Sequence, residues 1–223
     1  MTTPVIIFTV VYILLLASYL ITETSGKMYL RAPNKVLLAV MFFTFAVVVF
    51  TTSDRYSVNS YHSLLIAALF LAMLGDVFLL FDFNRGGDFF LAGNICFTIY
   101  EIAILTEKGV TFSRYYWLII VTVVLMLQYL FLFTKFKTIF KLDKMKYPML
   151  FYLASITIHG MMGTALMIYV PEMFHLGLGS LLFYLSDLVL TLDRFVFKNK
   201  WSLRANSALY FTGMLLIVLN MVF

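Results

Sequence analysis

The sequence predicts an all-α membrane protein in which eight transmembrane helices form one bundle. Hydrophobic residues make up 63% of the 223 positions and charged residues only 12%, against roughly a quarter in an ordinary soluble domain. Apolar stretches of about 20 residues, the length that crosses a bilayer, follow one another with short polar interruptions. Because they are continuous and do not alternate with a period of two, they favour helices over barrel strands. Residues 1–223 are therefore expected to form a single integral membrane domain.

The predicted helices cover residues 4–22, 35–52, 61–81, 88–106, 115–133, 148–169, 174–195 and 204–222. In chain order, the segments between them carry Glu23 and Lys27, Asp54 and Arg55, Asp82 and Arg85, Lys108 and Gly109, Lys135 to Lys146, Pro171 and Glu172, and Lys198 and Lys200. The first stretch lacks both a basic leader and a small-residue cleavage site, so it is expected to be a retained helix. The single cysteine, Cys96, excludes a disulfide within the chain and a thiolate metal cluster.

Basic residues predict the orientation of the bundle. Thirteen of the 16 Lys and Arg residues lie in or beside the first, third, fifth and seventh loops; the others are Arg55, Lys108 and Arg114. The positive-inside rule then places the odd-numbered loops in the cytoplasm and both termini outside, in a bacterial-type inner membrane or its equivalent. Topology thus accounts for the net charge of +5 without nucleic-acid binding. The loop from Lys135 to Lys146 is expected to contact anionic membrane lipids. The sequence leaves open whether the chain forms a homo-oligomer.

Three acidic residues, Asp76, Glu101 and Asp187, lie inside predicted spans, where a charge costs about 2.5–3.5 kcal/mol and commonly marks a functional site. Asp76 and Asp187 both lie on helices that run toward the cytoplasm. At 1.5 Å per residue, both carboxylates are expected roughly 8–11 Å inside the cytoplasmic boundary. Two carboxylates at one depth are typical of a buried acid/base site. The alternative is that each carboxylate binds a neighbouring helix and serves packing alone.

Other polar residues are predicted around this layer. Asn94, Tyr152 and Tyr210 lie in it or close to it, whereas Glu101 lies deeper, where a structural pairing and a site role both stay open. Asp82 and Asp193 are expected to form ion pairs at the membrane surface with Arg85 and Arg194. The histidines show no metal-ligand spacing, so no metal is expected. Ser186 adjoins Asp187, but no histidine at that depth would activate it as a nucleophile.

The two halves of the chain show a weak internal repeat. Asp76 and Asp187 are 111 residues apart, as are Asp82 and Asp193, and Lys35 and Lys146. This spacing suggests a parallel four-plus-four duplication about an axis along the membrane normal. Three matched charges in an apolar background are equally open to a chance origin.

Two segments resemble a known family. The stretch GLGSLLFYLSDLVLTLDRF, from Gly177 to Phe195, is similar to the seventh-helix signature of the YhhN-type membrane proteins, which include the lysoplasmalogenases. LAMLGDVFLL, from Leu71 to Leu80, is similar to the Gly-Asp motif of that family. The length and the eight-helix plan agree over the whole chain. The chain departs from the family pattern at Glu101, where a histidine is expected, at Met214, where a glutamine is usual, and at Pro33-Asn34-Lys35, where the family has Lys-Pro.

The resemblance implies hydrolysis of the vinyl ether bond of a lysoplasmalogen, which gives a fatty aldehyde and a glycerophospho-head-group product. This chemistry requires an acid, a carboxylate that stabilises positive charge and guides water, and no cofactor. Asp76 and Asp187 would form this couple, with the roles of acid and stabiliser left open. Substrate-binding positions would be Asn94, Tyr152, Tyr210, Glu101, Ser186 and Lys35, the last as a phosphate anchor at the cytoplasmic headgroup level.

The alternative function is a non-enzymatic carrier of lipids or small solutes that uses the aspartate pair as a proton relay. Carriers typically have helices broken by Gly or Pro near the bilayer midplane. Here Pro4, Pro33, Pro148 and Pro171 are all predicted at helix ends. This placement favours the hydrolase.

Overall fold

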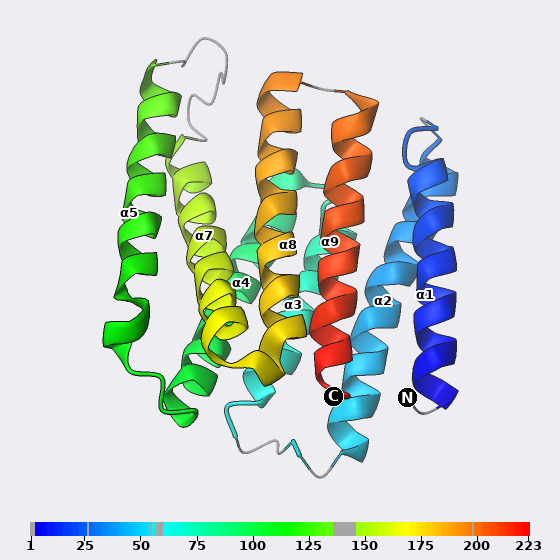
Figure 1. Cartoon of the computed structure of the whole chain (residues 1–223). Coiled ribbons are helices and arrows are strands. Elements are labelled where there is room, and N and C mark those ends of the chain that lie inside the picture. Colours follow the sequence, from blue (N-terminus) through cyan, green and yellow to red (C-terminus); the bar gives the residue numbers. More distant parts are fainter. Residues whose placement is uncertain (1–2, 26, 54, 57–59, 136–145, 198) are drawn as a thin grey trace.

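The computed structural model describes residues 3–25, 27–53, 55–56, 60–135, 146–197 and 199–223, and over these ranges it is helical with no strand (Figure 1). Its helices are α1 (Thr3–Thr22), α2 (Met28–Thr52), α3 (Ser63–Phe78), α4 (Phe83–Glu107), α5 (Phe112–Lys135), α7 (Lys146–Tyr169), α8 (Phe174–Leu192) and α9 (Lys200–Asn220). A short 3₁₀ turn, η2 (Pro171–Met173), precedes α8, and a π-helical turn, η3 (Asp193–Phe197), follows it. The all-α prediction is confirmed. The predicted lipid-facing loop at 136–145 lies outside the described residues.

Seven helical segments of the described residues, 20–26 residues long when α8 is counted with its flanking turns, have the length and hydropathy to cross a bilayer. The remaining helix, α3, is equally apolar but has only 16 residues, about 24 Å at 1.5 Å per residue. That is shorter than the roughly 30 Å hydrocarbon layer. Hydrogen-bonded turns at residues 79–81 extend α3 at its C-terminal end. The chain is an integral membrane protein.

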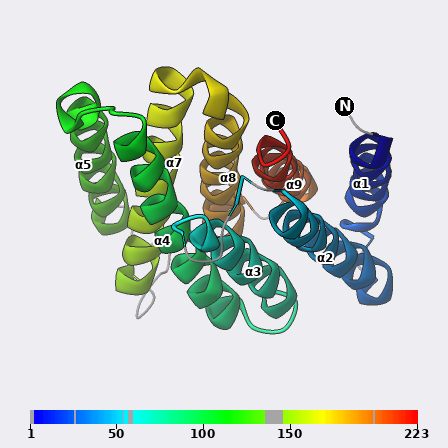
Figure 2. The same cartoon turned by 90° about the horizontal axis from the view of Figure 1, so that it is seen from below.

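The helices run alternately up and down, and both ends of the chain lie at the same end of the bundle (Figure 1). Viewed along the axes, α5, α7, α8, α9 and α1 form one row, with α4, α3 and α2 packed beside it (Figure 2). The most extensive packing joins α8 to α9, α3 to α4 and α7 to α8, and α4 also packs on α7. This even-numbered, antiparallel arrangement agrees with the predicted topology. Which end faces the cytoplasm stays a prediction from the basic residues.

Two helices start five or more residues earlier than predicted. Helix α2 begins at Met28 and not at residue 35, so Pro33 lies inside a continuous helix and not at its end. Helix α4 begins at Phe83 and not at residue 88, because the Asp82 side chain accepts the backbone N–H groups of Asn84 and Arg85 at 2.9 and 3.3 Å. Hydropathy marks only the apolar part of a helix, whereas both helices extend into a polar layer.

Small residues let α7, α8 and α9 approach closely. A Cβ added to Gly177 on α8 would overlap the carbonyl oxygen of Gly163 on α7, and one added to Gly179 would lie 2.6 Å from the carbonyl oxygen of Gly213 on α9. Backbone contact of this kind is the usual packing device between membrane helices. It holds the inner face of α8, which carries Ser180, Phe183 and Asp187, against its neighbours.

Candidate active site

Asp76 lies near the end of α3 and is 1% exposed. Its Oδ1 atom is 3.2 Å from the Nζ of Lys35 on α2, and its Oδ2 accepts a 2.7 Å hydrogen bond from the Tyr210 hydroxyl on α9. Gly75 beside it allows α4 to approach, because a Cβ there would lie 2.8 Å from the Phe90 ring. The carboxylate is therefore held by a cation and a phenol from two different helices.

The position of Lys35 differs from the prediction. The sequence places it at the start of a helix, as a phosphate anchor at headgroup level. Because α2 begins seven residues earlier, Lys35 lies two turns inside the helix, and its side chain is only 14% exposed. Its ammonium faces Asp76 and not the membrane surface, so its contact in the structure is a carboxylate.

Asp187 lies on α8 and is 5% exposed. Its Oδ2 accepts a short hydrogen bond from the Tyr152 hydroxyl on α7. The neighbouring Ser186 hydroxyl donates to the carbonyl oxygen of Phe183 in its own helix at 2.7 Å. Among the described residues, no cation lies within ion-pair distance of Asp187. The two aspartates thus differ: both have a phenol donor, but within the described part of the chain only Asp76 has a cation at ion-pair distance.

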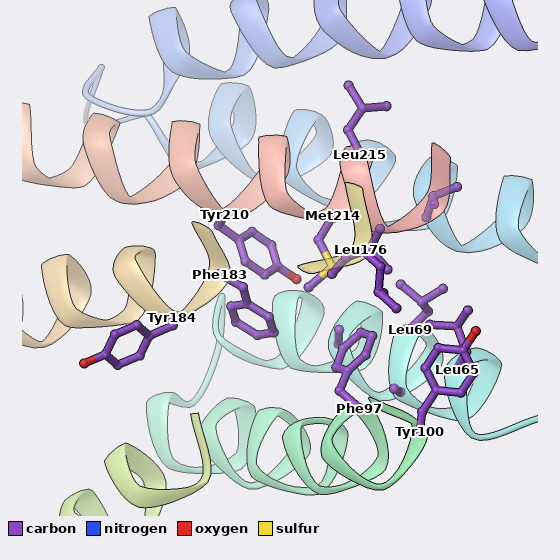
Figure 3. Packing of buried hydrophobic residues seen from close by; sticks show 14 of the residues in the cluster. Leu65, Leu69, Phe97, Tyr100, Leu176, Phe183, Tyr184, Tyr210, Met214 and Leu215 are labelled. Carbon is purple, nitrogen blue, oxygen red and sulfur yellow. The ribbon is translucent and has the colours of Figure 1, made fainter. Parts of the chain in front are cut away.

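An aromatic cluster lies next to both carboxylates. The rings of Tyr210 and Phe183 lie next to each other (Figure 3). Their centroids are 5.2 Å apart, and the Phe90 centroid is 5.7 Å from that of Tyr210 and 5.9 Å from that of Phe183. Phe183 lies one turn before Asp187 on α8, and Tyr210 donates to Asp76. These rings form the low-dielectric surroundings of the site, in which hydrogen bonds and charges act more strongly than in water.

A cavity of about 420 Å³ lies between the end of α3 and helices α4, α7 and α8. Most of its lining is apolar, and its residues are Leu79, Phe83, Asn84, Gly87, Asp88, Phe90, Leu91, Pro148, Met149, Phe151, Tyr152, Leu190 and Thr191. Neither aspartate is among these lining residues. Tyr152 joins the cavity to the site, since it lines the first and hydrogen-bonds to Asp187 in the second.

Asn94 on α4 is fully buried and is connected to Tyr152 through one hydrogen-bonded serine. Its Nδ2 donates to the Ser155 hydroxyl at 3.3 Å, and that hydroxyl donates to the backbone carbonyl of Tyr152 at 2.7 Å. The Asn94 Oδ1 has no partner within the described part of the chain. Asn94 therefore supports the turn of α7 that carries Tyr152, through a serine that sequence reasoning missed.

Glu101 belongs to a separate buried cluster. Its Oε2 is 3.1 Å from His159 Nδ1 on α7, and its Oε1 accepts a 2.7 Å hydrogen bond from the Ser180 hydroxyl on α8. Phe97 stacks on the imidazole with ring centroids 4.8 Å apart, and the Glu101 and His159 side chains are both 0% exposed. His159 therefore belongs to a buried polar contact that the sequence did not indicate. Asn94 and Glu101 are seven residues apart on α4, as are Tyr152 and His159 on α7. Residues at this spacing lie on one side of a helix, so the four share the sides on which α4 and α7 face each other.

The surface aspartates have different partners. Asp82 caps α4, and its Oδ2 lies 3.6 Å from the Arg85 Nε, which confirms the predicted pair. Asp193 is 7% exposed and accepts from the Asn199 N–H at 3.0 Å and from the Ser202 hydroxyl, so its predicted pairing with Arg194 is wrong. Instead, the Arg194 guanidinium lies over the Phe83 ring, 4.9 Å from its centroid.

No group of three or more His, Cys, Asp or Glu side chains in the described ranges is placed to hold a metal ion. The site thus offers carboxylates, phenols and one ammonium beside an apolar cavity. These groups can transfer protons and stabilise charge.

Comparison with curated proteins and with solved structures gave no match. The model of the YhhN family matches residues 30–221, which extend from the first turn of α2 to the end of α9 and contain both aspartates, Lys35 and the two tyrosines that bind the aspartates. The chain belongs to the YhhN family.

Proposed function

We propose that the protein hydrolyses the vinyl ether bond of lysoplasmalogen-type lysophospholipids and releases a fatty aldehyde and a glycerophospho-head-group product. The observation that carries the proposal is Tyr152, which lines an apolar cavity and hydrogen-bonds to the buried carboxyl of Asp187. A volume of about 420 Å³ lies within the roughly 300–1,000 Å³ range of small-molecule sites. Membership of the YhhN family agrees with this activity, because the family resemblance implies it.

The reaction needs a proton at carbon and a water molecule. Protonation of the alkene carbon next to the alkyl chain gives an oxocarbenium ion. Water adds to the cationic carbon, and the resulting hemiacetal breaks its C–O bond to give the aldehyde and the free glycerol hydroxyl. The proton lost by water restores the acid. A carboxylic acid, a carboxylate and bound water complete this balance without an added group.

The different partners of the aspartates suggest their roles. A buried carboxyl without a cation carries its proton at lower cost than one beside an ammonium. We therefore assign proton donation to Asp187, with the Tyr152 hydroxyl orienting its carboxyl. Asp76, held as a carboxylate by Lys35 and Tyr210, would stabilise the oxocarbenium ion and guide the water.

The carrier alternative has less support in the structure. Pro33 lies inside α2, which removes one sequence argument against a carrier. However, it lies in the second turn from the helix start, and α2 continues through it without a break. The described helices show no interruption near their middles, whereas carriers place their sites at such breaks.

The test is to incubate the purified protein with lysoplasmenyl lipids and to measure aldehyde by mass spectrometry. We expect Asp187→Asn to reduce turnover by at least about 10², the usual lower value for loss of general acid assistance. The matched control is Asp82→Asn, the same substitution at an aspartate outside the cavity, where asparagine also caps a helix well. Absence of aldehyde from the wild-type protein, or near-normal turnover by Asp187→Asn, would contradict the proposal.

A further inference from the structure

Polar side chains on α4, α7 and α8 form two groups that are about 10 Å apart along the bundle, since seven residues of helix separate them on each element. The first group is Asn94, Tyr152 and Asp187. The second group is Glu101, His159 and Ser180. All three side chains of the second group are buried, none of them lines the apolar cavity, and none has a part in the proposed chemistry.

Two buried polar atoms of these groups have no hydrogen-bond partner among the described residues. They are the Oδ1 of Asn94 and the Nε2 of His159, and both residues are 0% exposed. Ser155, which is bonded to Asn94, lies nine residues after Lys146, the first residue of α7, so the two atoms lie about 13 Å or more from the start of that helix. Buried polar atoms of native proteins are nearly all satisfied, by protein or by ordered water.

The local geometry brings these two atoms within reach of one small ligand. Helical side chains tilt toward the start of their helix, so the His159 imidazole faces the turn that carries Ser155, four residues earlier. The Asn94 Nδ2 donates to the Ser155 hydroxyl at 3.3 Å, so the amide lies beside that turn. One turn rises about 5.4 Å, which is about twice the roughly 2.8 Å length of a hydrogen bond to water.

The imidazole is held in place on its other sides. Its Nδ1 is 3.1 Å from Glu101 Oε2, and Phe97 stacks on its face with ring centroids 4.8 Å apart. Glu101 is fixed in turn by the Ser180 hydroxyl, which donates to its Oε1 at 2.7 Å. The carboxylate and the aromatic ring therefore set the orientation of His159 and leave its Nε2 for a further partner.

We propose that one internal water molecule bridges Asn94 Oδ1 and His159 Nε2, and that this site supplies the water that reacts in the proposed hydrolysis. Water fits either protonation state of the imidazole. It donates to a neutral Nε2 or accepts from a protonated one, and in both cases it donates to Asn94 Oδ1. Only the role of this water as reactant rests on the proposed function.

The position of the water site suits that role. Most of the cavity lining is apolar and would be covered by a lipid chain, so the reacting water needs a polar site of its own. Asn94 and Ser155 connect the proposed water to the turn of α7 that carries Tyr152, whose hydroxyl binds Asp187. In the reaction, the water oxygen bonds to the oxocarbenium carbon, and the proton that it loses restores the acid.

The first experiment detects the water without turnover. The chain has three histidines, so His62→Gln with His175→Gln leaves His159 alone, and nitrogen-15 labelling of histidine then reports on this ring. Solid-state NMR in lipid bilayers measures magnetisation transfer from water to the ring, which we expect although the side chain is 0% exposed. Asn94→Leu should abolish the transfer. The matched control is Thr157→Val, which removes an equally buried hydroxyl that bonds to its own helix, and it should keep the transfer.

The second experiment tests whether this water reacts. Added methanol competes for the oxocarbenium ion: its oxygen bonds to the same carbon, it loses its proton, and the product is a methyl acetal that mass spectrometry separates from the aldehyde. Asn94→Leu should raise the ratio of acetal to aldehyde by roughly two- to tenfold, the factor of one lost hydrogen bond. His159→Asn should do the same, because asparagine can still donate to Glu101 but has no atom at the Nε2 position. Thr157→Val should leave the ratio unchanged.

The water site is overturned if no transfer from water reaches His159, or if Asn94→Leu leaves that transfer unchanged. Should Asn94→Leu give no folded protein, the His159 signal and the acetal ratio of His159→Asn still decide the question. Failure of the proposed function gives a different pattern, in which the water signal persists while vinyl ether lipids release neither aldehyde nor acetal. Aldehyde release with one acetal ratio in all variants would overturn the role of this water as reactant.

Discussion

Substitutions at Lys35 and Asp76 separate the structural role of this ion pair from a catalytic one. From the sequence alone, Asp76→Asn would be expected only to remove the cost of burying a charge. The structure changes that expectation, since Asp76 is 3.2 Å from the Lys35 ammonium, whose side chain is 14% exposed. Removing one partner of a buried pair costs about 3–5 kcal/mol, because the other charge stays without compensation. For a chain of about this size, that corresponds to a melting temperature lower by roughly 6–20 °C.

The double variant Asp76→Asn with Lys35→Met should recover most of this loss. It removes both charges and keeps side chains of similar size, and replacement of a buried ion pair by neutral residues is commonly neutral or stabilising. The Tyr210 hydroxyl can still hydrogen-bond to the asparagine. Aldehyde release, in contrast, should stay as low as in Asp76→Asn alone, because the carboxylate is still missing.

The melting temperature can be measured through the single cysteine of the protein. Cys96, its single cysteine, lies partly buried on α4, so a thiol-reactive fluorescent dye gives one unfolding signal on heating in detergent. The stabilising role of the Lys35–Asp76 ion pair is refuted if Asp76→Asn melts like the wild type, or if the double variant is no more stable than the less stable single variant. Recovery of turnover in the double variant would remove Asp76 from the proposed chemistry.

Two further predictions concern packing. His159→Phe should retain the stack on the neighbouring aromatic ring but lower the melting temperature by roughly 2–12 °C, because a buried Glu101 oxygen left without its partner costs about 1–3 kcal/mol. Glu101→Gln, which keeps two hydrogen-bonding atoms, should cost clearly less in the same dye assay. An equal loss in both variants would contradict this difference. Gly177→Leu should yield little folded protein by size-exclusion chromatography, because its Cβ overlaps the Gly163 carbonyl oxygen. A monodisperse Gly177→Leu protein would show that α7 and α8 do not make this contact.

Depth along a membrane helix can be predicted well from sequence. The apolar runs are long, and each residue advances by a fixed rise, so counting from a helix end gives the layer of a side chain. Residue counting predicts Tyr152 and Tyr210 close to the level of the two aspartates, and both donate to those carboxylates in the structure. Their roles in turnover stay part of the proposal.

The direction in which a side chain faces is harder to predict, because hydropathy is similar all round a membrane helix. The Glu101 and His159 pair was missed for this reason, although both lie on the contact between α4 and α7. Lys35 was misplaced for a different reason. Its helix starts in a polar layer that hydropathy does not detect, so a residue two turns inside α2 was assigned to the surface.

The 111-residue spacing has a structural counterpart in the loops that follow α3 and α8. Asp82, after α3, accepts N–H groups at the start of α4, and Asp193, after α8, accepts the Asn199 N–H and the Ser202 hydroxyl at the start of α9. The two aspartates at equivalent places in the sequence therefore bind the beginning of the next helix. This shared contact supports a four-plus-four duplication more strongly than the matched charges alone.

The deeper aspartates, Asp76 and Asp187, do not make equivalent contacts. Their sequence positions are equivalent, but Asp76 is bound by Lys35 of α2 and by a tyrosine of α9, whereas Asp187 is bound by Tyr152 of α7. Two identical side chains in different surroundings are what an acid and a charge stabiliser require, since equal surroundings would give both the same protonation. In a duplicated chain, both halves would keep the aspartate, while the residues that bind the aspartate would differ between the halves. This difference would give two equivalent buried carboxyls the separate roles of acid and charge stabiliser.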